Sequence, residues 1–157
     1  MLIVFTHKKI ASDTFIYSAV KEYCLFYNLD IFDFTIERPQ GKKPYMSSNR
    51  LFFNLSHSNN YVVCAVSDKN VGIDLQYHNK KIDISAISKK YLQIELTDIQ
   101  TFYDYYAKAE ACAKLDGQSL GAKLKSFNNN AQLLRLFKDY SLAVCGQDKS
   151  YYIMELL

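Results

Sequence analysis

Between residues 51 and 76 the chain reads LFFNLSHSNNYVVCAVSDKNVGIDLQ. Three short runs within it, 51–55, 61–67 and 71–75, are rich in aromatic and β-branched residues. Ser, Asn and Asp-Lys-Asn residues separate the runs, and these residue types are typical of tight turns between strands. The sequence therefore predicts an antiparallel meander at the centre of the chain.

Helices are predicted on both sides of this meander. Before it, apolar residues recur at three- and four-residue spacing, and Ser12 or Asp13 can cap a helix that ends near residue 28. After it, a helix begins at Thr97 or Asp98 and extends to residue 114, with Gly117 placed to end it. Further strands are expected at residues 2–6, 31–37, 140–145 and 151–156.

The two halves of the chain resemble each other weakly. Residues 61–69 and 140–149 each contain an apolar run that ends in Asp-Lys, and each follows one of the predicted helices. This order indicates a duplicated α+β half. Chance recurrence of valine-rich hairpins explains the same likeness, so both explanations remain open.

The composition is that of one globular domain. Its 157 residues are 49% hydrophobic and 22% charged, which excludes a disordered or collagen-like chain. The net charge of +3 is too small for a dedicated nucleic-acid-binding protein. No apolar run approaches 18 residues, and residues 1–5 lack the features of a signal peptide. Four cysteines without CxxC spacing predict free thiols, and hence a cytoplasmic protein.

Two carboxylates stand out as candidates for chemistry. Asp74 lies in an apolar strand, where an unpaired charge costs several kcal/mol, so it either caps a strand end or binds a hard metal ion. Tyr106, Glu110 and Lys114 are spaced four apart and share one helix face. An ordinary surface salt bridge between Glu110 and Lys114 is the alternative, although alanines flank the pair as they do in a crowded helix.

Two polar segments are candidates for anion binding. In residues 53–58, FNLSHS, the side chains of Ser56 and His57 either bind oxyanions or satisfy backbone groups at a turn. In residues 41–45, GKKPY, the pair Lys42 and Lys43 either binds a phosphate or forms a solvated basic loop.

The order of these motifs is specific. G-K-x-P-Y, F-N-x-S-H-S, V-x-x-A-V and G-I-D are followed by a helix with aromatic-x-x-x-E-A-x-x-K, then D-G and Leu120. Over roughly residues 41–120 this series resembles the 4′-phosphopantetheinyl transferases of the Sfp-like branch. The resemblance implies an α+β pseudo-dimer of two similar halves, each a small antiparallel sheet packed on a long helix. It would form a single domain, 1–157, with halves at roughly 1–76 and 77–157 around a cleft for coenzyme A, and would be a monomer.

The resemblance also implies an activity. Such enzymes transfer the 4′-phosphopantetheine arm of coenzyme A to a serine of an apo acyl or peptidyl carrier protein, with Mg²⁺, and release 3′,5′-ADP. Asp74 and Glu110 would hold the Mg²⁺, and Glu110 would also be the general base. The implied contacts to coenzyme A are Lys114 at the pyrophosphate, His57 and Ser56 at phosphates, and Lys43 and Lys42 towards the nucleotide end.

Two departures from the family pattern leave other functions open. Gln76 stands where many relatives have an acidic residue, so it would meet the metal through water or the metal would bind more weakly. Tyr106 and Ala109 replace the family's tryptophan and lysine, and Lys108 lies about 100° further round the helix. A degenerate homologue that binds coenzyme A or a carrier protein without turnover is the main alternative. A structural α+β protein with coincidental motifs would show no Mg²⁺-dependent nucleotide binding.

Overall fold

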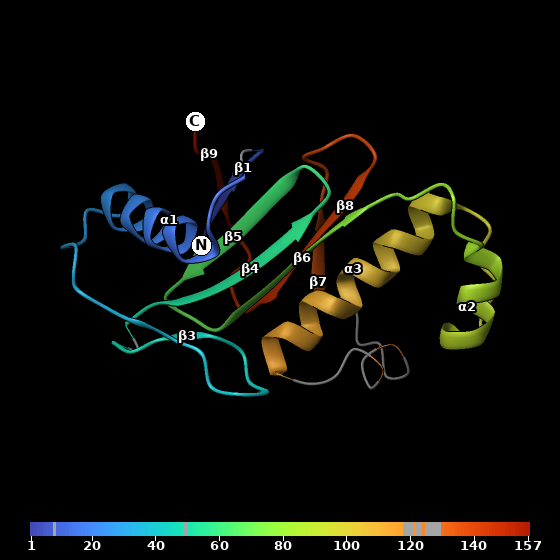
Figure 1. Ribbon diagram of the computed structural model, residues 1–157, viewed down its shortest axis with the longest axis horizontal. Coiled ribbons are helices and arrows are strands. Elements are labelled where there is room, and N and C mark those ends of the chain that lie inside the picture. Colours follow the sequence, from blue (N-terminus) through green and yellow to red (C-terminus); the bar gives the residue numbers. More distant parts are fainter. Residues whose placement is uncertain (8, 49, 118–120, 122–123, 125–129) are drawn as a thin grey trace.

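The computed structural model describes residues 1–7, 9–48, 50–117, 121, 124 and 130–157, so Leu120 lies outside the described residues (Figure 1). The helices are α1 (Ser12–Phe26), α2 (Ile84–Leu92) and α3 (Ile99–Asp116). The strands are β1 (Leu2–Thr6), β2 (Ile36–Glu37), β3 (Tyr45–Met46), β4 (Phe52–Ser58), β5 (Tyr61–Ser67), β6 (Val71–Tyr77), β7 (Ala131–Leu134), β8 (Tyr140–Gly146) and β9 (Tyr152–Glu155).

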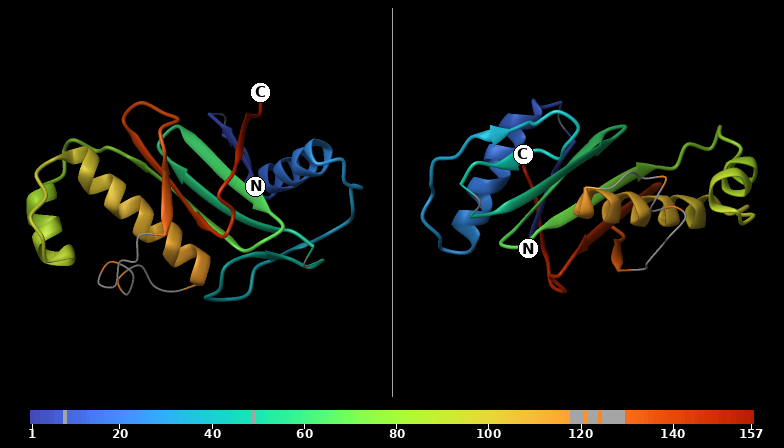
Figure 2. Two further views of the ribbon diagram at one scale, coloured as in Figure 1. Left: turned by 180° about the vertical axis from the view of Figure 1, so that it is seen from behind. Right: turned by 90° about the horizontal axis from the view of Figure 1, so that it is seen from below.

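Two sheets lie between helices α1 and α3, and the view from below in Figure 2 shows this layering. The first sheet has the strand order β4-β5-β1-β9, in which β9 runs parallel to β1 and the other pairs are antiparallel. The second sheet, β6-β8-β7, is antiparallel throughout. The mixed α+β class expected from the sequence is therefore confirmed.

Side-chain alternation in β1 and β5 builds a core on both faces of the first sheet. Leu2 and Val4 pack with α1, whereas Ile3 between them joins a second cluster with Ile73 of β6 and Leu142 of β8. Successive residues of a strand point to opposite faces, so a run of consecutive apolar residues fits a strand that is covered on both sides. The second cluster thus joins the two sheets.

Helix α3 packs closely on the outer face of the second sheet. The side chains at this contact are small: Ala107 and Ala111 of α3 pack against Ala143 and Cys145 of β8. At Gly72 of β6 an added Cβ would lie 2.0 Å from the carbonyl oxygen of Ala111, so only glycine permits this approach. The alanines around Glu110 therefore mark a crowded helix, as their sequence context indicated.

The predicted ends of α3 agree with the structure, and so does the end of α1 to within two residues, but the N-cap of α1 does not. The Asp98 side chain accepts a hydrogen bond from the Thr101 amide at the start of α3, and Gly117 ends it with φ of 66°. At α1 the N-cap is Ala11 without a side-chain hydrogen bond, and the helix ends at Phe26. Helix α2 and strand β7 have no counterpart in the sequence prediction.

The predicted three-stranded meander is wrong in its third strand. Strands β4 and β5 form the expected hairpin, but β6 pairs with β8 and lies beside β4 rather than β5. Side chains of β4, rather than its backbone, accept hydrogen bonds from the backbone amides of β6. The hydrogen bonds run from the Ile73 amide to Asn54 Oδ1 (2.8 Å), from the Leu75 amide to Ser56 Oγ (3.2 Å) and from the Tyr77 amide to Ser58 Oγ (2.9 Å).

Two other strand predictions are corrected. Of residues 31–37 only Ile36 and Glu37 form a strand, since the preceding Phe32 and Phe34 pack against the α1 core without a neighbouring strand. The final strand β9 does not form a hairpin with β8, because it pairs with β1 in the other sheet. A division at residue 76 therefore does not follow the two sheets, and the proposed duplication stays a prediction.

Two composition-based expectations can be compared with the structure directly. All four cysteines are buried and free, as expected from their spacing. Among the described residues no helix is long and apolar enough to cross a membrane.

Candidate active site between strand β6 and helix α3

Asp74 lies at the centre of β6 and is only 1% exposed. Its Oδ1 atom accepts hydrogen bonds from Ser56 Oγ at 2.9 Å and from Lys114 Nζ at 2.6 Å. Its Oδ2 atom accepts one from Gln76 Nε2 at 2.7 Å. A buried charge needs such partners, and here they come from β4, from β6 and from α3. Three segments that are distant in sequence thus meet at one carboxylate.

Ser56 connects the two sheets at this point. Its hydroxyl donates to Asp74 and accepts from the Leu75 amide and from Lys114 Nζ at 3.1 Å. The polar residues of FNLSHS that alternate along β4 therefore bind β6, a role that sequence reasoning missed for Asn54 and Ser58. The signal was present, because a period of two places all three side chains on one face of the strand.

Lys114 binds Asp74 rather than Glu110. Its ammonium group makes three hydrogen bonds, to Asp74 Oδ1, to Ser56 Oγ and to the carbonyl oxygen of Ile73 at 3.2 Å. An ammonium has three donors, so all of them are in use. The alternative of a surface salt bridge between Glu110 and Lys114 is therefore wrong for the described residues.

Glu110 lies close enough to Asp74 and Lys114 for their charges to affect its pKa. Within the described ranges no hydrogen bond or ion pair reaches its carboxylate. Burial raises the pKa of Glu110, the negative charge of Asp74 raises it further, and Lys114 lowers it in part. The site therefore combines two acidic side chains with one ammonium group, which leaves an excess of negative charge.

The Asp74 and Glu110 pair fits a hard metal ion. No group of three or more His, Cys, Asp or Glu side chains suited to a metal exists in the part of the chain that the structure describes. Mg²⁺ does not need one, because it is typically held by one or two carboxylates together with water and phosphate oxygens. Gln76 adds an amide next to Asp74.

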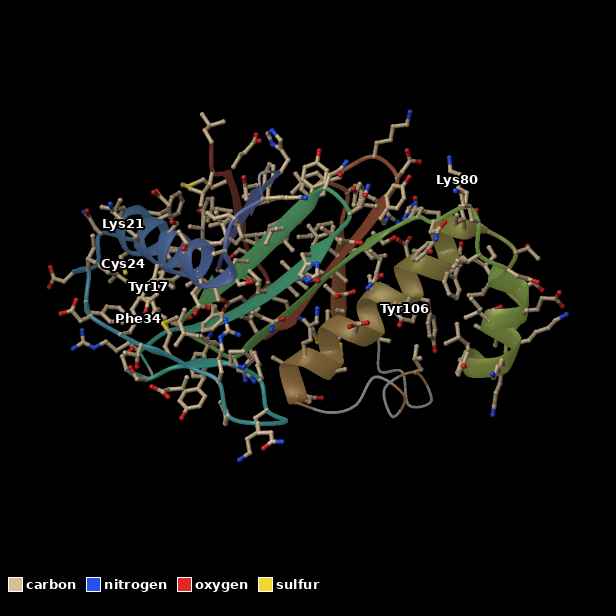
Figure 3. The ribbon with its side chains drawn as sticks, in the orientation of Figure 1. Tyr17, Lys21, Cys24, Phe34, Lys80 and Tyr106 are labelled. Carbon is tan, nitrogen blue, oxygen red and sulfur yellow. The ribbon has the colours of Figure 1, made fainter. Side chains whose placement is uncertain are left out.

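Tyr106 projects from α3 (Figure 3), one helical turn before Glu110. It lines an apolar cavity of about 300 Å³ between α2 and α3. Burial raises the pKa of Tyr106, and the charges of Glu110 and Asp74 raise it further. The cavity therefore adjoins the carboxylate pair. Its other lining residues are Ile87, Tyr91, Leu92, Phe102, Gly121 and Leu124.

Lys43 is half-buried beside the first residue of β6. Its Nζ donates to the carbonyl oxygen of Val71 at 2.6 Å and to Asn70 Oδ1 at 3.1 Å. Burial lowers the pKa of Lys43 to about 8, Cys64 opposes this shift, and the charge of Lys114 adds to it. Lys43 lines a cavity of about 290 Å³ with aromatic walls, whereas Lys42 is exposed on the preceding turn.

His57 is separated from the carboxylate pair. It points away from Ser56 on β4 and lines a different cavity, of about 300 Å³, with His7 and Lys9. The structure therefore brings together Asp74, Glu110, Lys114, Ser56 and Gln76. It places Lys43 and His57 in two flanking cavities, and it leaves Lys42 exposed.

No protein-family model matches the chain. It is 26% identical to the 4′-phosphopantetheinyl transferase Sfp of Bacillus subtilis (strain 168), over 88% of this chain and 62% of that protein. A 4′-phosphopantetheinyl transferase of Bacillus subtilis is 30% identical over 78% of this chain and 57% of its own length. The 4′-phosphopantetheinyl transferase HetI of Nostoc sp. (strain PCC 7120 / SAG 25.82 / UTEX 2576) is 36% identical over 48% of this chain and 36% of its own. The chain thus spans less than two thirds of the length of these curated relatives.

Proposed function

We propose that this chain, which belongs to the Sfp-like branch of the 4′-phosphopantetheinyl transferase superfamily, transfers the 4′-phosphopantetheine arm of coenzyme A to a carrier protein. The acceptor is a serine hydroxyl of an apo acyl or peptidyl carrier protein. A new bond forms between the serine oxygen and the phosphorus of the arm, and the pyrophosphate bond breaks to release 3′,5′-ADP. The observation that carries the proposal is the buried, hydrogen-bonded Asp74 next to Glu110, whose carboxylate has no hydrogen-bond partner among the described residues.

Asp74 and Glu110 would hold a Mg²⁺ ion, with Gln76 contributing through water. When bound, the ion supplies positive charge that neutralises the pyrophosphate oxygens as the leaving group departs. The excess of negative charge at this pair supports the assignment. Gln76 is a neutral ligand, so the ion would bind less tightly than at a site with three carboxylates.

Glu110 would accept the proton of the attacking serine, directly or through a water molecule. A general base works best when its pKa lies close to the working pH. Burial and the neighbouring Asp74 both move the pKa of Glu110 in that direction. Asp74 is suited to a fixed role instead, because both of its oxygens already accept hydrogen bonds.

The basic residues around the pair would bind coenzyme A. Lys114 would reach the pyrophosphate, Lys43 with Lys42 would face the nucleotide end, and His57 would bind a phosphate. The aromatic wall of the Lys43 cavity suits a nucleobase, and His7 and Lys9 add basic groups beside His57. Ser56 would mainly hold Asp74 and Lys114 in place, since its hydroxyl is buried between them.

The proposal extends to the state of the protein. We expect a monomer. The four buried, free cysteines favour a cytoplasmic protein, and the net charge of +3 favours one that acts without nucleic acid or membrane. A carrier protein and coenzyme A are its expected partners.

The test is incubation with coenzyme A, Mg²⁺ and several apo carrier proteins, followed by mass spectrometry of the carrier. We expect a mass gain equal to the phosphopantetheine arm, and none after Asp74→Asn. A chain that binds coenzyme A but modifies no carrier would overturn the proposal in favour of a binding protein without turnover.

A further inference from the structure

We propose that Lys114 competes with the metal ion for Asp74 and leaves it for the phosphates of coenzyme A, so that metal and coenzyme A bind cooperatively. The inference rests on the proposed function. It concerns the order and the coupling of binding rather than the transfer reaction.

The contacts of Asp74 show why a metal ion alone binds poorly. Lys114 Nζ lies 2.6 Å from Oδ1, and Gln76 Nε2 lies 2.7 Å from Oδ2. Both oxygens of the carboxylate therefore carry a donor. A divalent cation that approaches Asp74 has to displace an ammonium group whose three donors are all satisfied.

Among the described residues, Asp74 is the carboxylate that forms an ion pair with this ammonium group. Glu110 lies one turn earlier on α3, but it is the second carboxylate that the metal would use. Movement of Lys114 towards solvent is possible, since its side chain is 25% exposed and flexible. It also stays close to Lys43, whose pKa is lowered first by burial and then by the positive charge of Lys114, so the two ammonium groups repel each other. Binding of the metal alone is therefore opposed by the lost contact between Lys114 and Asp74 and by the repulsion between Lys114 and Lys43.

Coenzyme A removes this opposition. Its pyrophosphate oxygens accept hydrogen bonds from an ammonium group and carry negative charge, so they can replace Asp74 as the partner of Lys114. Asp74 is then free to bind the metal. By thermodynamic reciprocity the metal strengthens coenzyme A binding by the same factor.

Mn²⁺ binding, measured by the EPR signal of the free ion, tests the coupling without any carrier protein or turnover. In the unmodified chain we expect coenzyme A to tighten Mn²⁺ binding by about tenfold or more. In Lys114→Met we expect Mn²⁺ without coenzyme A to bind about tenfold more tightly, and coenzyme A to add less than about threefold. Lys114→Gln keeps a hydrogen-bond donor and should behave in the same way if Lys114→Met does not fold.

Lys149→Met is the matched control, because it removes one positive charge from an exposed position outside the site. It should behave like the unmodified chain. Equal Mn²⁺ affinity in the unmodified chain and both Lys114 variants, measured without coenzyme A, would overturn the inference. Mn²⁺ binding that survives Asp74→Asn would instead overturn the metal site of the proposed function, so the two failures are distinguishable.

Discussion

Two aspartates, one on β6 and one on α3, accept hydrogen bonds from similar side chains and yet differ in purpose. Asp74 on β6 is bound by a lysine, a serine and a glutamine: Lys114, Ser56 and Gln76. Asp104 on α3 is bound by an arginine, a serine and a glutamine: Arg135, Ser141 and Gln100.

The difference lies in the cation and in what surrounds it. Arg135 holds both oxygens of Asp104 with its guanidinium fork, an arrangement that fixes geometry. Ser141 of β8 also forms a hydrogen bond of 2.9 Å with the buried His78, which directly follows β6. The Asp104 cluster therefore joins α3 to β8 and to the end of β6. Near Asp74 the cation is a single ammonium group that contacts only one carboxylate oxygen, and Glu110 is left unpartnered among the described residues. A closed set of charges forms a structural clamp, whereas an open one leaves room for a ligand.

The largest effect should separate the two aspartates directly. Asp74→Asn is expected to reduce transfer by roughly 10³-fold or more, because it removes both a metal ligand and the partner of Lys114. Asp104→Asn should leave transfer within about threefold while lowering the free energy of unfolding by about 1–3 kcal/mol. Transfer assays and urea denaturation of both variants measure this. Equal loss of transfer in the two would show that Asp104 is not merely a clamp.

A second prediction is that Glu110, unlike Asp104, lowers the stability of the ligand-free fold. Glu110→Gln should slow transfer by about 10²- to 10⁴-fold, the usual contribution of a general base. At pH 7 it should also raise the melting temperature of the ligand-free chain, because the raised pKa of Glu110 means that the fold disfavours its charged form. Differential scanning calorimetry checks this, and a lower melting temperature would contradict it.

Glu110 and Asp104 should therefore change the free energy of unfolding with pH in opposite directions. As the pH falls through the raised pKa of Glu110, its unfavourable contribution disappears. Burial acts to raise the pKa of Asp104, but hydrogen bonds from Arg135, Ser141 and Gln100 outweigh this and lower it. The stabilisation from Asp104 is present above the ordinary pKa of an aspartate and is lost as the pH falls through the lower folded pKa.

A third prediction compares the two glutamines. Gln76→Glu should tighten Mg²⁺ binding by about tenfold, because a charged ligand replaces a neutral one. Gln100→Glu should give no such gain and should lower the free energy of unfolding by about 1–2 kcal/mol, since it replaces a donor to Asp104 with a like charge. Titration calorimetry with Mg²⁺ distinguishes them, and a gain for Gln100→Glu would contradict the comparison.

The smallest effect is expected from the cation of the clamp. Arg135→Lys removes the bidentate contact with Asp104 but keeps the charge. The Arg135 side chain is 54% exposed, so the expected loss is less than about 1 kcal/mol, with transfer unchanged. Urea denaturation measures it against Arg38→Lys, an equivalent change at an exposed ion pair with Asp13.

Local patterns in the sequence were sufficient for much of the fold and for part of the site. The β4–β5 hairpin, the ends of α3 and the crowding around Ala111 follow from turn residues, caps and small side chains. The partner of β6 does not follow from such patterns. On one edge its amides donate to side chains of β4, and on the other edge its backbone pairs with β8, a strand about 70 residues later. Helix α2, which the sequence did not predict, is short, and Ser88 is the one buried residue within Ile84–Leu92.

By itself the sequence determined which chemical groups exist and on which strand or helix each lies, because periodicity and capping are short-range properties of the backbone. It identified Asp74, Glu110 and Lys114 as the important charges, but the one partner within the protein that it offered Lys114, as an alternative, was its helical neighbour Glu110. Only the tertiary structure decided that Lys114 reaches across to Asp74 and leaves Glu110 unpartnered among the described residues. The physical reason is burial: at the close contact between Gly72 and Ala111 a buried aspartate needs a counter-charge more than a half-buried glutamate does.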